Sequence, residues 1–97
     1  MRELLYVYDC TDSRKKNARR VMFTKELYGF VYTWKTKLGV REKRKTGLLD
    51  ECHGSSAIAD SAVLVPDQYR NVYSELFRRY SDIVKVKLYA ITEQLEV

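Results

Sequence analysis

The sequence predicts an α+β domain in which two helices cover one face of an antiparallel sheet. Two observations predict this class. Two segments repeat apolar residues at the three- and four-residue spacing of amphipathic helices, and short apolar or alternating segments typical of strands lie before, between and after them. The chain has 97 residues, enough for one small domain with one core, and we therefore expect residues 1–97 to form a single domain.

The first strand is expected at residues 3–10, which are apolar on both faces. Odd-numbered residues ending in Asp9 share one face, and even-numbered residues ending in Cys10 share the other. Such a strand is typical of a central position in a sheet, covered on at least one side. The polar residues 11–13 offer helix N-caps, and a basic first helix is expected from residue 14.

The end of the first helix has two interpretations. Gly29 can end it, with residues 30–34 forming a β-rich strand after it. Alternatively, the helix continues through Gly29 to Leu38, because an apolar stripe with helical spacing extends that far. One internal glycine costs only about 1 kcal/mol, which does not decide between the two. We favour the strand, because a small sheet needs a second strand before residue 57.

Residues 35–56 contain loop signals and many positive charges. They predict a long basic loop or hairpin in the middle of the domain, either functional or simply solvated. Regular structure is expected again at residues 57–65, and the second half of this segment is typical of a buried strand. The clearest helix is expected at residues 67–82, after a proline suited to a first helical turn, and the last strand at residues 83–91, with 92–97 as a tail. The resulting order, β-α-β-β-α-β, is the ferredoxin-like arrangement.

Positive charge is concentrated in the first half of the chain. Residues 1–48 carry 13 Lys/Arg and 5 Asp/Glu, residues 49–97 carry 5 and 8, and the net charge is +5. A basic half on a small domain indicates an anionic partner, most commonly DNA or RNA, and the alternative is a surface that is merely soluble. No apolar run approaches the roughly 20 residues that span a bilayer, and the basic run lacks a broad apolar helical face, so no membrane partner is expected.

The candidate nucleic-acid contacts form two basic clusters. The first helix supplies Arg14, Lys15, Lys16, Arg19 and Arg20, and the middle segment supplies Lys35, Lys37, Arg41, Lys43, Arg44 and Lys45. Such groups give affinity for phosphate without reading sequence. Tyr32 and Trp34 lie next to the second cluster and would stack on bases if exposed, although we favour core packing for Trp34.

Chemistry other than phosphodiester cleavage finds little support in the sequence. The only histidine, His53, directly follows Cys52, which is an awkward geometry for a nucleophile and its base. The run from Asp50 to His53 contains metal-ligand types but lacks a second cluster of zinc ligands. The scattered glycines include no phosphate-binding loop. Cys10 is typical of a small core residue.

A carboxylate at a strand end can hold Mg²⁺ or Mn²⁺ against a phosphate oxygen. Asp9 has this position, and Asp12 follows three residues later. One monomer supplies few carboxylates, so a metal site here needs a symmetric homodimer that brings two Asp9 side chains together. The alternative is that Asp9 accepts hydrogen bonds from the turn while Asp12 or Ser13 caps the helix.

The start of the chain resembles a known family. Tyr8-Asp9, two further residues, Asp12 and then Arg14-Lys15-Lys16-Asn17 are similar to the opening of the small CRISPR-associated endonucleases of the Cas-two type, and residues 67–91 resemble that family's last α–β unit. The resemblance implies a ferredoxin-like homodimer, Asp9 as the metal-binding catalytic aspartate, and nucleic-acid contacts from the basic residues after it. The chain departs from the family at residues 30–57, which are longer than the family's compact middle region.

Three functions are open on the sequence alone. The first is a nucleic-acid-binding homodimer that resembles these endonucleases, with or without Mg²⁺-dependent cleavage. The second is a non-catalytic DNA- or RNA-binding regulator, or an archaeal, viral or plasmid accessory protein. The third is a protein-interaction module that uses an exposed sheet edge or the face of Lys85, Lys87 and Tyr89. The N-terminus lacks a signal-peptide pattern, which predicts a cytoplasmic protein, and the low Asn and Gln content, two of each, favours a thermophilic source.

Overall fold

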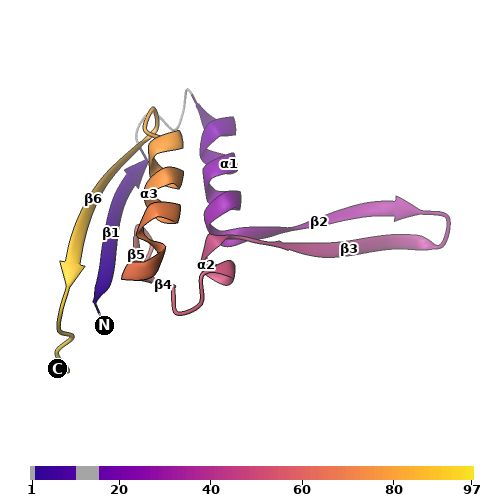
Figure 1. Ribbon diagram of the computed structural model, residues 1–97. Helices are drawn as coiled ribbons and strands as arrows, with labels where there is room; N and C mark the ends of the chain where they lie inside the picture. The colour runs from indigo at the N-terminus through magenta and orange to yellow at the C-terminus, as the bar shows by residue number, and fades with distance from the viewer. Residues whose placement is uncertain (1, 11–15) are drawn as a thin grey trace.

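The protein consists of a two-layer body from which a long hairpin projects (Figure 1). The computed structural model describes residues 2–10 and 16–97. In chain order the elements are β1 (Glu3–Cys10), α1 (Asn17–Tyr28), β2 (Gly29–Thr36), β3 (Gly39–Thr46), α2 (Leu48–Glu51), β4 (Ser56–Ala59), β5 (Ala62–Pro66), the 3₁₀ turn η1 (Asp67–Tyr69), α3 (Arg70–Arg79) and β6 (Val84–Ile91). This confirms the predicted mixed α+β class.

The main sheet has four strands in the order β4-β5-β1-β6, and each neighbouring pair is antiparallel. The central position predicted for β1 is therefore confirmed. Its register places Leu5 opposite Leu64 of β5 and Tyr89 of β6. Helices α1 and α3 lie against one face of this sheet in Figure 1, and the other face carries Asp9.

The core fills the space between the sheet and the two helices. Tyr6 and Tyr8 of β1 point into it, where their rings lie 5.1 and 5.6 Å from that of Phe77 on α3. Phe23 of α1 completes the cluster at 5.7 Å from Phe77. The period-two pattern of β1 and the helical stripe of α3 therefore meet in one aromatic core. The stripe is narrower than its sequence suggests, because Val72 is 44% exposed.

Residues 30–34 form a strand, as favoured from the sequence, but it belongs to a different sheet from the one expected. Within the described residues β2 pairs with β3 alone, and the strand that pairs with β5 on the side away from β1 is β4. The reason lies in the side chains: β3 is exposed along its whole length and rich in cations, so the pair cannot be covered by a helix. The alternative helix through Leu38 is wrong, since α1 ends at Tyr28 and Gly29 caps it with a positive φ of 81°.

The stretch expected as a long basic loop or hairpin at residues 35–56 is mostly regular structure. It contains the end of β2, a two-residue turn, all of β3, and the short helix α2 before β4 begins. The helix expected at residues 67–82 is shorter, because η1 opens it and α3 ends at Arg79. The last strand starts one residue later than expected, at Val84. None of the described helices is long and apolar enough to cross a membrane.

Two glycines and one arginine attach the hairpin to the body. Gly29 and Gly47 face each other where the hairpin leaves α1, so closely that a Cβ on Gly47 would overlap the backbone of the crossing segment. Arg44 donates to the backbone oxygen of Tyr28 at 3.1 Å and to the carboxylate of Asp50 at 2.6 Å. Asp50 also accepts from the backbone N–H of Gly47 at 3.0 Å. These bonds fix the direction in which the hairpin leaves the body.

Candidate nucleic-acid interface

One face of the hairpin carries a row of aromatic rings. Phe30, Tyr32 and Trp34 alternate along β2, so their side chains share a face. The rings of Phe30 and Tyr32 lie 6.0 Å apart, and those of Tyr32 and Trp34 lie 5.7 Å apart and nearly parallel, at 28°. Tyr32 is 40% exposed and Trp34 44%. The core packing favoured for Trp34 from the sequence is therefore wrong, because β2 does not join the main sheet.

The same face carries a row of cations on the neighbouring strand. In the β2–β3 register Lys45 lies opposite Phe30, Lys43 opposite Tyr32, and Arg41 opposite Trp34. Residues directly opposite one another in a sheet project to the same side. We call these six residues the hairpin face: Phe30, Tyr32, Trp34, Arg41, Lys43 and Lys45.

The positive net charge of the chain is concentrated in the hairpin. Residues 29–46 carry six Lys/Arg and one Asp/Glu, a net charge of +5, which equals the net charge of the whole protein. The remainder of the chain carries 12 of each and is neutral. Because five of the six hairpin cations make no ion pair with any described residue, their charge is available to an anionic partner.

The other expected cations of the middle segment lie elsewhere on the hairpin. Lys35 is on the opposite face, since it pairs with Val40, and Lys37 is in the turn. Arg44 is also on the opposite face and is bonded to Asp50 and the end of α1. The six cations that appeared as one cluster in the sequence therefore divide into three on the hairpin face, two near the tip and one anchor.

The cations of α1 are arranged differently from the patch that the sequence predicted. Arg19 bonds Asp82 at 3.0 Å and the backbone oxygen of Arg79 at 2.8 Å, and its guanidinium lies 4.5 Å from the centre of the Tyr80 ring. Lys16 reaches Asp82 at 3.5 Å. Hydrogen bonding to Asp82 raises the pKa of Arg19. These two side chains hold α1 to the end of α3, and of the expected patch Arg20 alone is exposed without a described ion pair. Arg14 and Lys15 lie outside the described residues.

Asp9 lies near the end of β1, on the sheet face that the helices leave open. It is exposed, and the residue opposite it on β6 is Lys85. Among the described residues no three His, Cys, Asp or Glu side chains gather where they could hold a metal ion, and Asp12 lies outside them. A single carboxylate beside an ammonium group does not fit Mg²⁺ or Mn²⁺, which take several oxygen ligands. Metal binding by Asp9 stays a prediction that depends on residues from a second chain.

The remaining candidates from the sequence separate in space. Cys52 belongs to the core, where burial raises the pKa of its thiol, while the neighbouring His53 is exposed. Asp50 is bonded to Arg44 instead of facing a metal. Cys10 is half-buried at the end of β1, and burial raises the pKa of its thiol too.

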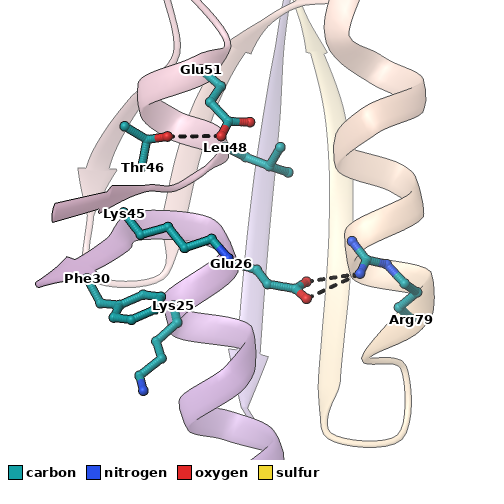
Figure 2. Close-up of a pocket in the computed structure, with 8 residues that line it drawn as sticks. All are labelled: Lys25, Glu26, Phe30, Lys45, Thr46, Leu48, Glu51 and Arg79. Atoms are coloured by element: carbon teal, nitrogen blue, oxygen red, sulfur yellow. Dashed lines mark hydrogen bonds and ion pairs between the residues drawn. The ribbon is translucent and has the colours of Figure 1, made fainter. Parts of the chain in front are cut away.

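A pocket of about 230 Å³ lies where the hairpin meets the body (Figure 2). Its lining comes from α1, both hairpin strands, α2 and α3, and consists of Lys25, Glu26, Phe30, Lys45, Thr46, Leu48, Glu51 and Arg79. Glu26 pairs with Arg79 at 3.1 Å, and Glu51 accepts from Thr46 at 3.0 Å. The ammonium group of Lys25 lies 4.6 Å from the centre of the Phe30 ring. The pocket shares Phe30 and Lys45 with the hairpin face and so continues it towards the body.

The cations of the middle segment are evident from the sequence, but their pairing with the aromatic rings is not. The signal was present as an alternation, because Phe30, Tyr32 and Trp34 are two residues apart, as are Arg41, Lys43 and Lys45. The sequence does not specify the hairpin register, which brings the two series to one side.

Comparison of the chain with protein-family models, curated proteins and solved structures found no match.

Proposed function

We propose that the protein binds nucleic acid through the hairpin face. The observation that carries this is that one projecting hairpin carries both the whole net charge and an aromatic row in which Tyr32 and Trp34 are exposed. Unpaired Lys and Arg side chains bind phosphate by releasing counterions, and exposed aromatic rings stack on bases. A surface that is merely soluble accounts for the lysines but not for the exposed, stacked rings of Tyr32 and Trp34 beside a half-buried Phe30.

Two double variants with the same change of charge test this proposal. Lys43→Gln/Lys45→Gln removes two cations from the hairpin face, and Lys85→Gln/Lys87→Gln removes two from alternate positions of β6, on the open face of the main sheet. Binding of a labelled oligonucleotide is measured by fluorescence anisotropy over a range of salt concentrations. We expect the first variant to bind more weakly and to lower the slope of log K against log salt by about 1.4 to 1.8. The second leaves both nearly unchanged. Equal effects of the two variants would contradict the proposal.

The proposed fold of the body is ferredoxin-like with the hairpin as an insertion. Three observations support it: the antiparallel order β4-β5-β1-β6, the two main helices on one face, and the position of the hairpin and α2 between α1 and β4. In this interpretation the β-α-β-β-α-β order expected from the sequence is formed by β1, α1, β4, β5, α3 and β6. The insertion also accounts for the long middle region in which the chain departs from the CRISPR-associated endonucleases.

Cleavage is a separate proposal from binding, and it rests on Asp9 alone. Its exposed position at a strand end supports contact with a partner, and a homodimer would supply the second carboxylate. The test is an assay of DNA and RNA cleavage with and without Mg²⁺ or Mn²⁺, using the native protein and Asp9→Ala. Cleavage that needs the metal and is lost in Asp9→Ala supports the proposal. If cleavage persists in Asp9→Ala, the catalytic assignment is wrong, and if neither protein cleaves, the protein is a non-catalytic binder.

A protein-interaction module is the third candidate, and the open face of the main sheet is the place for it. Leu5 and Val7 lie opposite Tyr89 and Lys87 there, so the face mixes apolar and charged groups. A titration with DNA and RNA at low salt distinguishes this candidate from the first two. Absence of binding to both would favour it over the proposed function.

A further inference from the structure

We infer that the ligand of the hairpin face is a single strand of DNA or RNA, with its bases on the aromatic row and its phosphates along the cationic row. This inference rests on the proposed function and names the form of nucleic acid that the face accepts. Three features of the hairpin carry it: the division of groups between the two strands, the composition of the opposite face, and the continuation of the face into the pocket.

The hairpin face separates its two kinds of group completely. All three aromatic residues belong to β2, and all three cations belong to β3. Neighbouring strands lie about 4.8 Å apart, so the two rows run side by side along the hairpin. A single nucleic-acid strand has the matching form, because its bases project to one side of one phosphate backbone. One row of rings beside one row of charges therefore fits one strand.

A duplex fits this face poorly. Its bases are stacked on one another and expose only their edges in the grooves, so a row of aromatic rings has no base faces to stack on. A two-stranded β-ribbon in a groove also lies between two phosphate backbones and needs cations on both sides. Strand β2 supplies none on the hairpin face. The opposite face carries Glu42, the bonded Arg44 and, near the tip, Lys35 as its one cation without an ion pair to a described residue. The charges are thus arranged for one backbone.

The face has room for several nucleotides. Phe30 and Trp34 are four residues apart on a strand, a distance of about 13 Å. At the body end the row continues into the pocket of Figure 2, where Lys25 lies over the Phe30 ring and Lys45 is shared with the hairpin face. This places the site near the small end of the range of about 4 to 16 nucleotides known for single-strand binding folds.

Trp34 provides a direct readout, because it is the only tryptophan of the chain. The experiment titrates the protein with oligothymidylate or oligouridylate of about 12 nucleotides, and with a duplex of the same length, while following tryptophan fluorescence and the anisotropy of a labelled strand. We expect the single strand to bind more tightly than the duplex and to quench Trp34. Trp34→Ala should weaken single-strand binding by about 5- to 150-fold, and Trp34→Phe should retain most of it.

The matched control is Val31→Ala, an exposed position of the same strand on the opposite face. It should leave single-strand affinity unchanged, and circular dichroism should show that the Trp34 and Val31 variants are all folded. A duplex that binds as tightly as the single strand, without quenching Trp34, would overturn this inference and leave the proposed function standing. A protein that binds neither form at low salt would overturn the proposed function itself.

Discussion

Substitution of Gly47 by alanine tests how the hairpin is attached to the body. The backbone of Gly47 has an ordinary extended conformation, so the substitution causes no conformational strain of its own. Its consequence is a collision, because the new Cβ would lie 2.5 Å from the carbonyl carbon of Tyr28 and 2.6 Å from the backbone oxygen of Leu27, and closer still to the nitrogen of Gly29. All three are backbone atoms, and no side-chain rotation can relieve the overlap.

The expected loss of stability is near the top of the range for overpacking, about 3 kcal/mol. Two of the three colliding atoms belong to the last turn of α1, and Leu27 in that turn is completely buried. Displacing them therefore disturbs the core of the body as well as the hairpin. A domain of this size loses about 4–8 °C of Tm for each kcal/mol, so Tm should fall by about 12–24 °C.

Gly39→Ala at the tip of the hairpin is the control. Gly39 has a positive φ of 131°, but no atom lies within 4 Å of a Cβ built there. It should lose only the backbone term, about 1–2 kcal/mol, and mostly within the hairpin. Thermal unfolding followed by far-UV circular dichroism measures both variants. If Gly47→Ala unfolds at the same temperature as Gly39→Ala, or above it, the close crossing of the two glycines is not a constraint.

Three further predictions concern the body. Phe77→Ala should lower the free energy of unfolding by about 3–5 kcal/mol, measured by chemical denaturation, because its ring is the centre of the aromatic core. Tyr6→Phe should cost about 1 kcal/mol in the same assay, since the Tyr6 hydroxyl is bonded to Ser74 at 2.9 Å, and an unchanged midpoint would contradict this. Asp82→Asn should be less stable than the native protein at neutral pH, because hydrogen bonding from Arg19 holds the pKa of Asp82 below its ordinary value of 3.8. That contribution is present above pH 3.8 and is lost as the pH falls through the lowered pKa, so Tm measured against pH should show the two proteins converging in acid.

The body could be predicted from the sequence where local patterns determine burial. The alternation of β1 and the helical stripe of α3 identify the sides that face the core, because an element with one apolar side has one way to bury it. Gly29 correctly marked the end of α1, since few residues other than glycine adopt its positive φ. These features depend on a few neighbouring residues and not on distant partners.

The candidate site could not be predicted in the same way, because it depends on which segments pair. The strand at residues 30–34 was predicted, but an alternating segment does not specify its partner, so the exposed Trp34 was expected in the core. The cations of α1 show the same difficulty. Nothing near Arg19 in the sequence indicates that Asp82, 63 residues away, will bond it. Which cations remain without an ion pair is therefore determined by the fold and not by their neighbours in the sequence.

The division between body and hairpin gives the strongest reason to regard the hairpin face as an interface. None of the residues that form the described core comes from β2 or β3. A two-stranded ribbon is marginally stable alone, and exposed aromatic rings do not add burial that would stabilise it. The protein nevertheless holds this ribbon in a fixed direction with Arg44, Asp50 and the paired glycines. Arg44 is also the one hairpin cation with an ion pair among the described residues, and it points back to the body. The anchor and the exposed groups are thus separate sets of residues, as expected if the hairpin is positioned by the body in order to bind a partner along its free face.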